Sequence, residues 1–277
     1  MMLAFTKMQS LGNDFVLIDG VRQPFPFEID LIRNLADRKK GIGFDQLLVA
    51  VSGEGNADFS MRIFNRDGSE AEQCGNGARC FARFLRDQHL TDLDQFIVKT
   101  INQTIGIQIN SGLEISVDMG KPNFDPAFIP FVASSISRTY DLDIEGEIVE
   151  ISVLSFGNPH AVLLVNDIEA APVERLGPLI ESHSRFPNRT NVGFAEPVSR
   201  SRIKLRVWER GVGETLACGS GACAAVVACH KLGKIDDEVE IEFKGGIATA
   251  KWIDKGSVLL SGPAETVFHG QIDLRFL

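Results

Sequence analysis

The sequence predicts an α+β protein of two similar domains, each with β-strands around a central helix, and an active site in the cleft between them. The main observation is a repeated pentapeptide. Residues 74–78, Cys-Gly-Asn-Gly-Ala, return as residues 218–222, Cys-Gly-Ser-Gly-Ala, which lie 144 positions further on (218 − 74). Three further pairs keep that offset to within one residue: Arg66 and Arg210, Glu70 and Glu214, and Asn13 and Asn158. Agreement at separate positions indicates an internal duplication.

The boundary between the two domains is predicted at Gly120-Lys121-Pro122, a loop-forming sequence near the middle of the chain. The first domain is predicted to span residues 1–119, with the last strand, at about 266–277, as a candidate to complete it. The second domain is predicted to span residues 120–265. A length of 277 residues suits two domains of this size.

Hydrophobic periodicity predicts the same order of elements in each half. The first half is expected to contain strands at 3–8 and 14–18, a helix from 28 to about 39, strands at 45–51 and 58–64, a helix from 75 to about 88, and three strands between 96 and 119. The second half is expected to contain strands at 148–154 and 161–165, a helix at 173–183, a strand at 203–208, a helix from 219 to about 232, and strands at 239–243, 247–252, 258–261 and 266–268.

The two helices that follow the cysteine turns differ in their side chains. The helix from 219 is small and apolar nearly all round, which predicts that it is buried. Arg79, Arg83 and Arg86 predict a more polar side for the helix from 75.

Composition narrows the class of protein. A hydrophobic content of 44% and a charged content of 23% are typical of a soluble globular domain. The net charge of −9 comes from dispersed carboxylates and argues against a nucleic-acid partner. No apolar run approaches the roughly 20 residues that span a bilayer, and residues 1–7 lack the features of a signal peptide. We therefore expect a cytoplasmic protein with no membrane partner.

The five cysteines are expected to be reduced thiols, because an odd count in a reducing compartment is poor material for a disulfide framework. Their spacings contain no Cys-x-x-Cys pair, so no metal site is expected. Cys80, Cys223 and Cys229 lie inside the predicted helices and are expected to be buried. Cys74 and Cys218 instead lie where a helix begins.

A thiol at the start of a helix lies beside N–H groups that have no partner within the helix. The flanking glycines allow close backbone approach, so the same turn can hold a carboxylate or phosphate. The pKa of a thiol, ordinarily ~8.5, falls at helix N-termini and near cations. Such a cysteine can be a base, a nucleophile, a metal ligand or a redox centre. Two equivalent thiols on opposite sides of a cleft can remove a proton from one face of a carbon and deliver one to the other, which inverts a stereocentre.

Residues 65–80 and 208–222 resemble the two signatures of the diaminopimelate epimerase family. Residues 11–15, 41–46, 157–160 and 191–194 also fit that family, so the resemblance covers the whole chain. Members interconvert LL- and meso-2,6-diaminopimelate in bacterial lysine and cell-wall precursor synthesis. The resemblance implies a small-molecule substrate, no pyridoxal phosphate or other cofactor, no metal, and a homodimer.

The resemblance also implies roles for individual residues. Cys74 and Cys218 would form the acid/base pair, and His160 with Glu209 would orient the α-amino group and tune the thiols. Arg210 would bind the distal carboxylate, for which a bidentate guanidinium is suited. Phe268 falls at a dimer contact. The substrate pocket would be lined by Asn13, Gln46, Asn65, Asn158 and Asn191, and the amides for the reacting carboxylate would come from Gly75, Asn76, Gly219 and Ser220.

Three alternatives remain open. A related cysteine-pair racemase acting on proline or hydroxyproline belongs to the same class, although Arg210 and the asparagines suit a second charged end. A thiol redox protein would join Cys74 to Cys218 in a regulatory disulfide, but it lacks a Cys-x-x-Cys motif. A non-catalytic zinc-binding module is the third, and metal analysis tests it.

Overall fold

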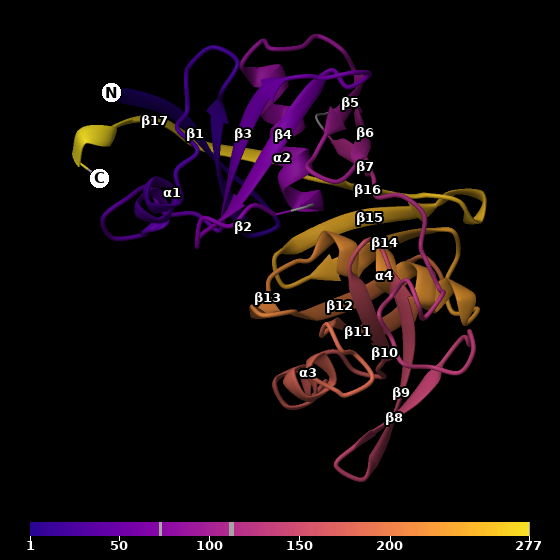
Figure 1. Ribbon diagram of the computed structural model, residues 1–277. Helices are drawn as coiled ribbons and strands as arrows, with labels where there is room; N and C mark the ends of the chain where they lie inside the picture. The colour runs from indigo at the N-terminus through magenta and orange to yellow at the C-terminus, as the bar shows by residue number, and fades with distance from the viewer. Residues whose placement is uncertain (72–73, 111–113, 277) are drawn as a thin grey trace. The chain divides into compact units, whose positions relative to one another are not determined.

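The computed structural model describes residues 1–71, 74–110 and 114–276, and the chain divides into two units (Figure 1). Unit 1 consists of Met1–Asp118 with Ser261–Leu277, and unit 2 of Met119–Leu260. Each unit combines many strands with two α-helices among its described residues, which confirms the predicted α+β class.

In unit 1 the strands pair in an order that alternates antiparallel and parallel neighbours. β1 is antiparallel to β17 and to β2, β2 is parallel to β3, β3 is antiparallel to β4, β4 is parallel to β5, and β5, β6 and β7 continue antiparallel. The bounds are β1 Met2–Ser10, β2 Asn13–Asp19, α1 Ile29–Ala36, β3 Gln46–Ser52, β4 Phe59–Asn65, α2 Gly75–Asp87, β5 Gln95–Lys99, β6 Thr104–Ile109, β7 Ile115–Asp118 and β17 Glu265–Asp273, followed by a 3₁₀ turn at Leu274–Phe276.

Unit 2 repeats this order. β9 is antiparallel to β8 and to β10, β10 is parallel to β11, β11 is antiparallel to β12, β12 is antiparallel to β13 and parallel to β14, and β14 is antiparallel to β15. The bounds are β8 Tyr140–Ile144, β9 Glu147–Ser155, β10 Pro159–Leu164, α3 Val173–Glu181, β11 Asn191–Ser199, β12 Arg202–Glu209, β13 Gly213–Thr215, α4 Gly219–Lys231, β14 Glu238–Phe243, β15 Gly246–Trp252 and a 3₁₀ turn Ile253–Lys255; β16, Val258–Gly262, carries the chain back to unit 1.

The two units share strand register as well as strand order. Phe15 of β2 lies opposite Gln46 of β3, and His160 of β10 lies opposite Asn191 of β11. Both members of the second pair are 145 residues beyond those of the first (160 − 15 and 191 − 46). A one-residue slip would turn every side chain to the other face, so the matching register confirms the duplication.

A repeated ion pair holds the loop before each cysteine. In unit 1 the Arg62 guanidinium donates to both oxygens of Glu70, at 2.6 and 2.9 Å. In unit 2 Arg206 donates to both oxygens of Glu214, at 2.7 and 2.9 Å. Bidentate geometry fixes orientation as well as distance. The predicted equivalence of the two glutamates is therefore accompanied by equivalent arginine partners on β4 and β12.

The helices that follow the cysteine turns, α2 and α4, pack against the strands of their own units (Figure 1). Nine residues of α4 are buried, which confirms its predicted burial. The prediction for α2 was wrong at Arg79, because that side chain is fully buried, whereas Arg83 and Arg86 form ion pairs with Asp87 and Asp94. Cys80, Cys223 and Cys229 are buried as predicted.

Several element boundaries differ from the sequence-based expectations. α1 ends at Ala36 rather than near 39, because the chain folds back so that the amides of Ile42 and Gly43 donate to Leu35 O. β8, β11 and β13 were not predicted; β11 contains Gly193 and Pro197, residues that disfavour a strand assignment. The strand predicted at 266–268 extends over Glu265–Asp273 because it pairs along β1. Residues 111–113, within the region predicted to hold three strands between 96 and 119, lie outside the described residues.

The longest described helices, α2 and α4, have 13 residues each. A helix needs about 20 apolar residues to cross a bilayer. Within residues 1–71, 74–110 and 114–276, no helix is long and apolar enough to do so.

The fold-back after α1 predicts that Gly41→Ala destabilises the protein. A Cβ at Gly41 would lie 2.1 Å from Asn34 O and 2.7 Å from Leu35 O, both backbone atoms. We expect the free energy of unfolding to fall by about 1–3 kcal/mol, as in other overpacked sites, measured by urea denaturation. Gly106→Ala is the matched control, because its nearest neighbour, Asp118 Cβ, is 3.9 Å away. Equal stability of the two variants would contradict this account of the fold-back.

Candidate active site

Each of the two repeated cysteines occupies the N-cap position of a helix. Cys74 precedes α2 with extended backbone angles of φ −149° and ψ 106°, and its Sγ accepts the Gly77 N–H at 3.3 Å. Cys218 precedes α4 with φ −128° and ψ 116°. N-cap side chains face the first-turn amides, which have no partner within the helix. Each sulfur therefore lies where backbone N–H groups and the positive end of a helix dipole favour an anion.

The second glycine of each turn leaves room for the sulfur. A Cβ at Gly77 would lie 3.3 Å from both Cβ and Sγ of Cys74. A Cβ at Gly221 would lie 3.3 Å from the same two atoms of Cys218. These distances are tighter than ordinary van der Waals contact. Glycine is therefore the residue that fits at the third helical position of both α2 and α4.

In unit 1, Asn13 faces Cys74. Asn13 Oδ1 lies 3.9 Å from Cys74 Sγ, while its Nδ2 donates to Asp45 Oδ2 at 3.0 Å. The bond to Asp45 determines which end of the amide faces the sulfur, since a carboxylate accepts only from the nitrogen. The carbonyl oxygen of Asn13 is thus available to accept a proton donor at the thiol.

A partly buried ion cluster supports this asparagine from behind. Asp14 accepts Lys7 Nζ at 2.5 Å and both terminal nitrogens of Arg38, at 2.9 and 2.7 Å. Lys7 is 8% exposed and also donates to the Gly43 carbonyl. Burial alone would raise the pKa of Asp14, but the hydrogen bonds from Arg38 and Lys7 outweigh it and hold that pKa far below its usual value. The cluster fixes the β1–β2 turn that presents Asn13.

Gln46 and Asn65 form a pair across β3 and β4. Gln46 Nε2 donates to Asn65 Oδ1 at 3.0 Å, and Asn65 Nδ2 donates to Ser69 Oγ at 3.1 Å. Gln46 Oε1 is buried and accepts no hydrogen bond within the described part of the chain. A buried acceptor of this kind costs free energy unless a donor reaches it. Gln46 is therefore suited to receive an N–H group of a ligand.

In unit 2, a chain of hydrogen bonds leads from His160 to Cys218. His160 Nε2 lies 3.1 Å from Asn158 Oδ1, Asn158 Nδ2 donates to Ser220 Oγ at 3.2 Å, and Ser220 Oγ lies 3.7 Å from Cys218 Sγ. Because the asparagine nitrogen donates to the serine, its oxygen accepts, so His160 carries its proton on Nε2. Ser220 then has its hydroxyl proton free to donate to the sulfur. The polar groups are thus oriented toward a negative charge on Cys218.

His160 is 1% exposed, and it is neutral at physiological pH. Burial lowers its pKa, and the positive charge of Arg210 lowers it further, to about 3. Since imidazole is uncharged at pH 7, His160 orients Asn158 rather than supplying a cation to the site. A neutral His160 can therefore influence Cys218 only through the hydrogen-bond chain of Asn158 and Ser220.

Cys218 is held as a neutral thiol in the unliganded protein. Burial raises its pKa well above the ordinary value, and the Glu209 carboxylate raises it further. The Gly221 amide and the Ser220 hydroxyl act in the opposite direction. Glu209 itself accepts the Thr215 hydroxyl at 2.6 Å. The described environment of Cys218 therefore favours a proton donor over a thiolate.

The loop that carries Glu209 and Arg210 is anchored by two buried residues. Asn191 Oδ1 accepts the Arg210 backbone N–H at 3.0 Å, and Asn191 Nδ2 donates to Pro159 O at 3.1 Å. Glu181, 7% exposed, accepts Trp208 Nε1 at 2.7 Å and Gly211 N at 2.8 Å. The Arg210 side chain is exposed and donates to Asn188 O at 3.2 Å.

The predicted site residues thus fall into two groups within the units. Unit 1 brings Asn13 close to Cys74 and joins Gln46 to Asn65 on neighbouring strands. Unit 2 links His160, Asn158 and Ser220 in a chain to Cys218, which Gly219 follows and Glu209 acts on, while Asn191 holds the backbone of Arg210. Gly75 and Asn76 begin α2, as Gly219 and Ser220 begin α4. Phe268 lies apart on β17, 46% exposed, with its ring 6.0 Å from that of Phe5.

Sequence reasoning missed the supporting residues Asp45, Glu181 and Thr215. Each acts through a partner distant in sequence: Asp45 holds Asn13, and Glu181 holds Trp208. A pattern of neighbouring residues in the sequence does not predict hydrogen bonds between residues so far apart. The family resemblance did include Asp45 within residues 41–46, which was the one available signal.

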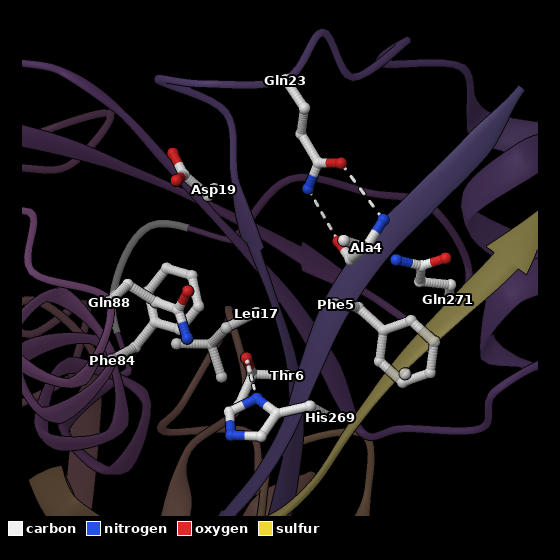
Figure 2. Close-up of a pocket in the computed structure, with 11 residues that line it drawn as sticks. Ala4, Phe5, Thr6, Leu17, Asp19, Gln23, Phe84, Gln88, His269 and Gln271 are labelled. Carbon is white, nitrogen blue, oxygen red and sulfur yellow. Dashed lines mark hydrogen bonds between the residues drawn. The ribbon is translucent and has the colours of Figure 1, made fainter.

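A separate cavity of about 470 Å³ in unit 1 contains none of the predicted site residues (Figure 2). Several of its polar side chains bond to protein atoms. Gln23 receives the Ala4 N–H and donates to Ala4 O at 3.1 and 2.7 Å, Thr6 Oγ1 lies 3.0 Å from His269 Nδ1, and Asp19 accepts the amides of its own turn. This cavity is poorly suited to a doubly charged amino acid. Among the described residues, no group of three or more His, Cys, Asp or Glu could hold a metal ion.

The family model described as diaminopimelate epimerase matches residues 5–125 and 152–267. The diaminopimelate epimerase of Alkalilimnicola ehrlichii is 50% identical over 278 residues, which cover 99% of this chain and 100% of the relative. That of Nitrosospira multiformis is 48% identical over 277 residues, covering 100% of both. The chain belongs to the diaminopimelate epimerase family. It is therefore an isomerase, as the resemblance implied.

Solved structures of proteins with low sequence identity to this chain have the same fold. A Bacillus anthracis phenazine biosynthesis protein of the PhzF family has a TM-score of 0.70 and 16% identity over 99% of each chain. A hydroxyproline epimerase from Agrobacterium vitis, with bound trans-4-hydroxy-L-proline, has a TM-score of 0.69 and 13% identity over 98% of this chain and 92% of that chain. These similarities confirm the predicted architecture of two duplicated α+β domains.

The ion cluster behind Asn13 predicts a pH-dependent effect of Asp14→Asn. Since the pKa of Asp14 is lowered by folding, its charge stabilises the protein fully above the unfolded value of 3.8, and this contribution is lost as pH falls through the folded value. We expect the variant to lose about 1–3 kcal/mol of unfolding free energy at pH 7, and less near pH 3. Urea denaturation at both values measures this.

The control for that measurement is Asp30→Asn, because the Asp30 side chain is 91% exposed and pairs only at the surface with Arg33. It should change stability little at either pH. A loss for Asp14→Asn that stays constant from pH 7 to pH 3 would contradict the assigned ionisation.

The anchor beneath Glu209 and Arg210 predicts that Glu181→Gln destabilises unit 2. Glu181 receives N–H donors at both oxygens, and a glutamine nitrogen cannot accept either of them. We expect a loss of about 1–3 kcal/mol and altered fluorescence of Trp208. Glu174→Gln, an exposed position on the same helix, should change neither. Wild-type stability and fluorescence in Glu181→Gln would refute the anchoring role.

Proposed function

We propose that this protein interconverts LL- and meso-2,6-diaminopimelate, with Cys74 and Cys218 as the acid/base pair. The observation that carries the proposal is the pair of equivalent N-cap thiols, each at the first-turn amides of a helix, in a chain about half identical to named diaminopimelate epimerases. We also propose that units 1 and 2 are the two domains of the duplication and that each contributes one thiol.

In the proposed reaction, one thiolate removes the proton from the α-carbon, and the other thiol delivers a proton to the opposite face. The C–H bond breaks on one side and forms on the other, so the net change is inversion at that carbon. No oxidant and no external group are consumed. The proton lost to the base returns to solvent before the next turnover, or the enzyme acts in the reverse direction.

Proton removal beside a carboxylate is difficult because negative charge accumulates on that group. A helix N-terminus contributes about 0.3–2 kcal/mol to an anion, and one well-placed oxyanion donor about 2.7–4 kcal/mol. Neither suffices alone. The amides at the start of both helices, at Gly75 and Asn76 of α2 and Gly219 and Ser220 of α4, offer a larger sum.

The protonation state of Cys218 supports a division into acid and base. Burial and Glu209 favour its neutral form, so it is suited to donate a proton. Ser220 can stabilise the thiolate that results, through its hydroxyl. Asn13, beside Cys74, holds a carbonyl oxygen toward the other sulfur.

The remaining predicted roles belong to the same proposal. Arg210 is exposed beside the site and suits a distal carboxylate. Gln46, with its buried acceptor, suits an ammonium group. A second candidate, racemisation of proline or hydroxyproline, has the fold similarity to the Agrobacterium vitis enzyme in its favour, but such substrates have no distal carboxylate for Arg210.

Four further expectations from the sequence and the family resemblance stay predictions. The enzyme would act without pyridoxal phosphate or metal. It would serve lysine and cell-wall precursor synthesis, lie in the cytoplasm and form a homodimer with Phe268 at the contact. Analytical ultracentrifugation of the wild-type protein and a Phe268→Ser variant tests the last of these.

The central prediction concerns LL-diaminopimelate incubated with the protein in D2O. Wild-type protein should incorporate deuterium at the α-carbon and produce the meso isomer. Cys74→Ala and Cys218→Ala should each lose at least roughly a thousandfold in turnover, because one acid/base group contributes about 10²–10⁴-fold and the pair acts as a unit. Mass spectrometry and chiral chromatography measure both changes.

Cys229→Ala is the matched control. Cys229 is buried in α4, and burial raises its pKa to about 12, so its loss should reduce stability but leave turnover near the wild-type value. Normal inversion by either Cys74→Ala or Cys218→Ala would rule out the two-base scheme. Deuterium exchange of proline or hydroxyproline, with none of diaminopimelate, would favour the second candidate.

A further inference from the structure

A fully buried arginine lies in the cysteine turn of unit 1. Arg79 is 0% exposed, and its Nη2 donates to Asn76 Oδ1 at 2.8 Å and to Ser10 Oγ at 2.9 Å. Ser10 Oγ in turn donates to Pro263 O at 2.8 Å. Ser10 and Asn76 are 0% and 4% exposed. The guanidinium therefore joins the end of β1, the first turn of α2 and the chain before β17 in one buried network.

The duplication supplies a natural comparison for this network. Position 79 corresponds to Cys223 in unit 2 (223 − 79 = 144), while Ser10 corresponds to Ser155 and Asn76 to Ser220. Cys223 is 0% exposed, like Arg79. In unit 2, Ser220 is instead held by Asn158 at 3.2 Å. The same helical position is thus cationic in one unit and neutral in the other, although the backbone around it is repeated.

An arginine at this position carries a desolvation cost as well as its hydrogen bonds. Taking a charge out of water costs several kcal/mol, which a buried ionic group often fails to recover. Arg79 is the fifth residue of α2, near the helix end where the dipole disfavours a cation. Unit 2 builds the equivalent helix with a cysteine there. A charge kept at such a position is better explained by its effect on the anion formed in the same turn.

Cys74, Arg79 and Cys80 share one electrostatic neighbourhood. Burial raises the pKa of the Cys80 thiol, the Arg79 charge opposes that shift, and a charge on Cys74 adds to it. Asn76, which Arg79 holds, lies two residues after Cys74 and its side chain is directed away from solvent. In unit 2 the charged neighbour of Cys218 is the Glu209 carboxylate. Arg79 and Cys74 thus both lie close enough to Cys80 to act on it, whereas the charge that acts on Cys218 is a carboxylate.

We propose that Arg79 is a positioning residue that fixes the Cys74 turn through Asn76 and favours the thiolate form of Cys74, while Glu209 favours the thiol form of Cys218. The duplicated protein then begins turnover with one base and one acid, despite equivalent helix termini on both sides. This inference rests on the proposed function for its catalytic meaning, but its effect on Cys74 is measurable without substrate.

Other ionisable groups lie on the described elements packed against α2. Lys7 of β1 pairs with Asp14 of β2, and His269 of β17 bonds to Thr6. Glu265 accepts Gln9 Nε2 at 2.6 Å and acts weakly to raise the pKa of Cys80. Further charged residues are Arg83, Arg86 and Asp87 of α2, Asp19 of β2, Asp118 of β7 and Asp273 of β17. All remain in place when Arg79 is replaced.

The test compares Arg79→Met and Arg79→Lys with the wild-type protein. The rate at which iodoacetamide alkylates Cys74 is followed from pH 5 to pH 10 and assigned by peptide mass spectrometry. Methionine keeps the volume and removes the charge, so we expect the alkylation midpoint to rise by roughly one pH unit, with about tenfold slower reaction at pH 7. Lysine keeps the charge and should keep the midpoint. Arg83→Met, which removes a partly exposed arginine of the same helix, is the matched control.

Steady-state kinetics with LL-diaminopimelate provide the second readout. Arg79→Met should lower kcat about tenfold and move the acidic limb of the kcat/KM profile upward, whereas Arg79→Lys should restore the position of that limb. Thermal unfolding should show Arg79→Met to be folded, with a lower Tm because Ser10 Oγ and Asn76 Oδ1 lose a donor. A purely structural role would give that lower Tm but leave the alkylation midpoint unchanged.

An unchanged Cys74 midpoint in folded Arg79→Met would overturn the proposal. If that variant does not fold, Arg79→Gln, which is neutral but can still donate to Asn76, is held to the same criterion. A midpoint that depends on Arg79 in a protein that does not turn over diaminopimelate would keep this inference and reject the proposed function, so the two failures are distinguishable.

Discussion

The structure depends on one constraint, the placement of a sulfur atom at the N-cap of a buried helix. That placement requires a cysteine with an extended backbone, as Cys74 and Cys218 both have. It also requires glycine three residues later, because a Cβ at Gly77 or Gly221 would press on the sulfur at 3.3 Å. The preceding strand and loop must deliver the cysteine in register, which the Arg62–Glu70 and Arg206–Glu214 pairs secure. The helix, the glycine and the ion pair therefore form one structural motif, which occurs once in each unit.

The two units share the backbone of this cysteine turn but differ in the side chains around it. Asn13 in unit 1 reaches the sulfur and is held by Asp45. Its equivalent, Asn158, reaches Ser220 and is approached by His160. Strand register is identical in the two units, since Phe15 stands where His160 does. Divergence at fixed register changes the chemistry around each thiol without disturbing the positions of the thiols themselves.

The parts predicted from sequence are those that depend on local patterns. The cysteine turns, the burial of α4 and the duplicated halves follow from short motifs and from residues three or four apart. The parts that were missed depend on distant partners. Arg79 was assigned to a wet helix face because its buried acceptors, Ser10 and Asn76, are side chains whose positions the helical pattern does not report. β11 was missed because Gly193 and Pro197 weaken its pattern, although pairing with both β10 and β12 stabilises it.

The proposed two-thiol inversion requires two like thiols to hold unlike protonation states. The helix dipoles and first-turn amides cannot distinguish them, because both cysteines occupy the same position on equivalent helices. Only residues that differ between the units can do so. Near Cys218 these are a carboxylate and deep burial, which favour the thiol. Among the described residues in the turn of Cys74, one that differs is Arg79, with its buried guanidinium. If both units had kept Glu209-like neighbours there would be two acids and no base; a cation in both would give two bases and no acid. The asymmetry that inversion requires must therefore reside in these side chains rather than in the repeated backbone.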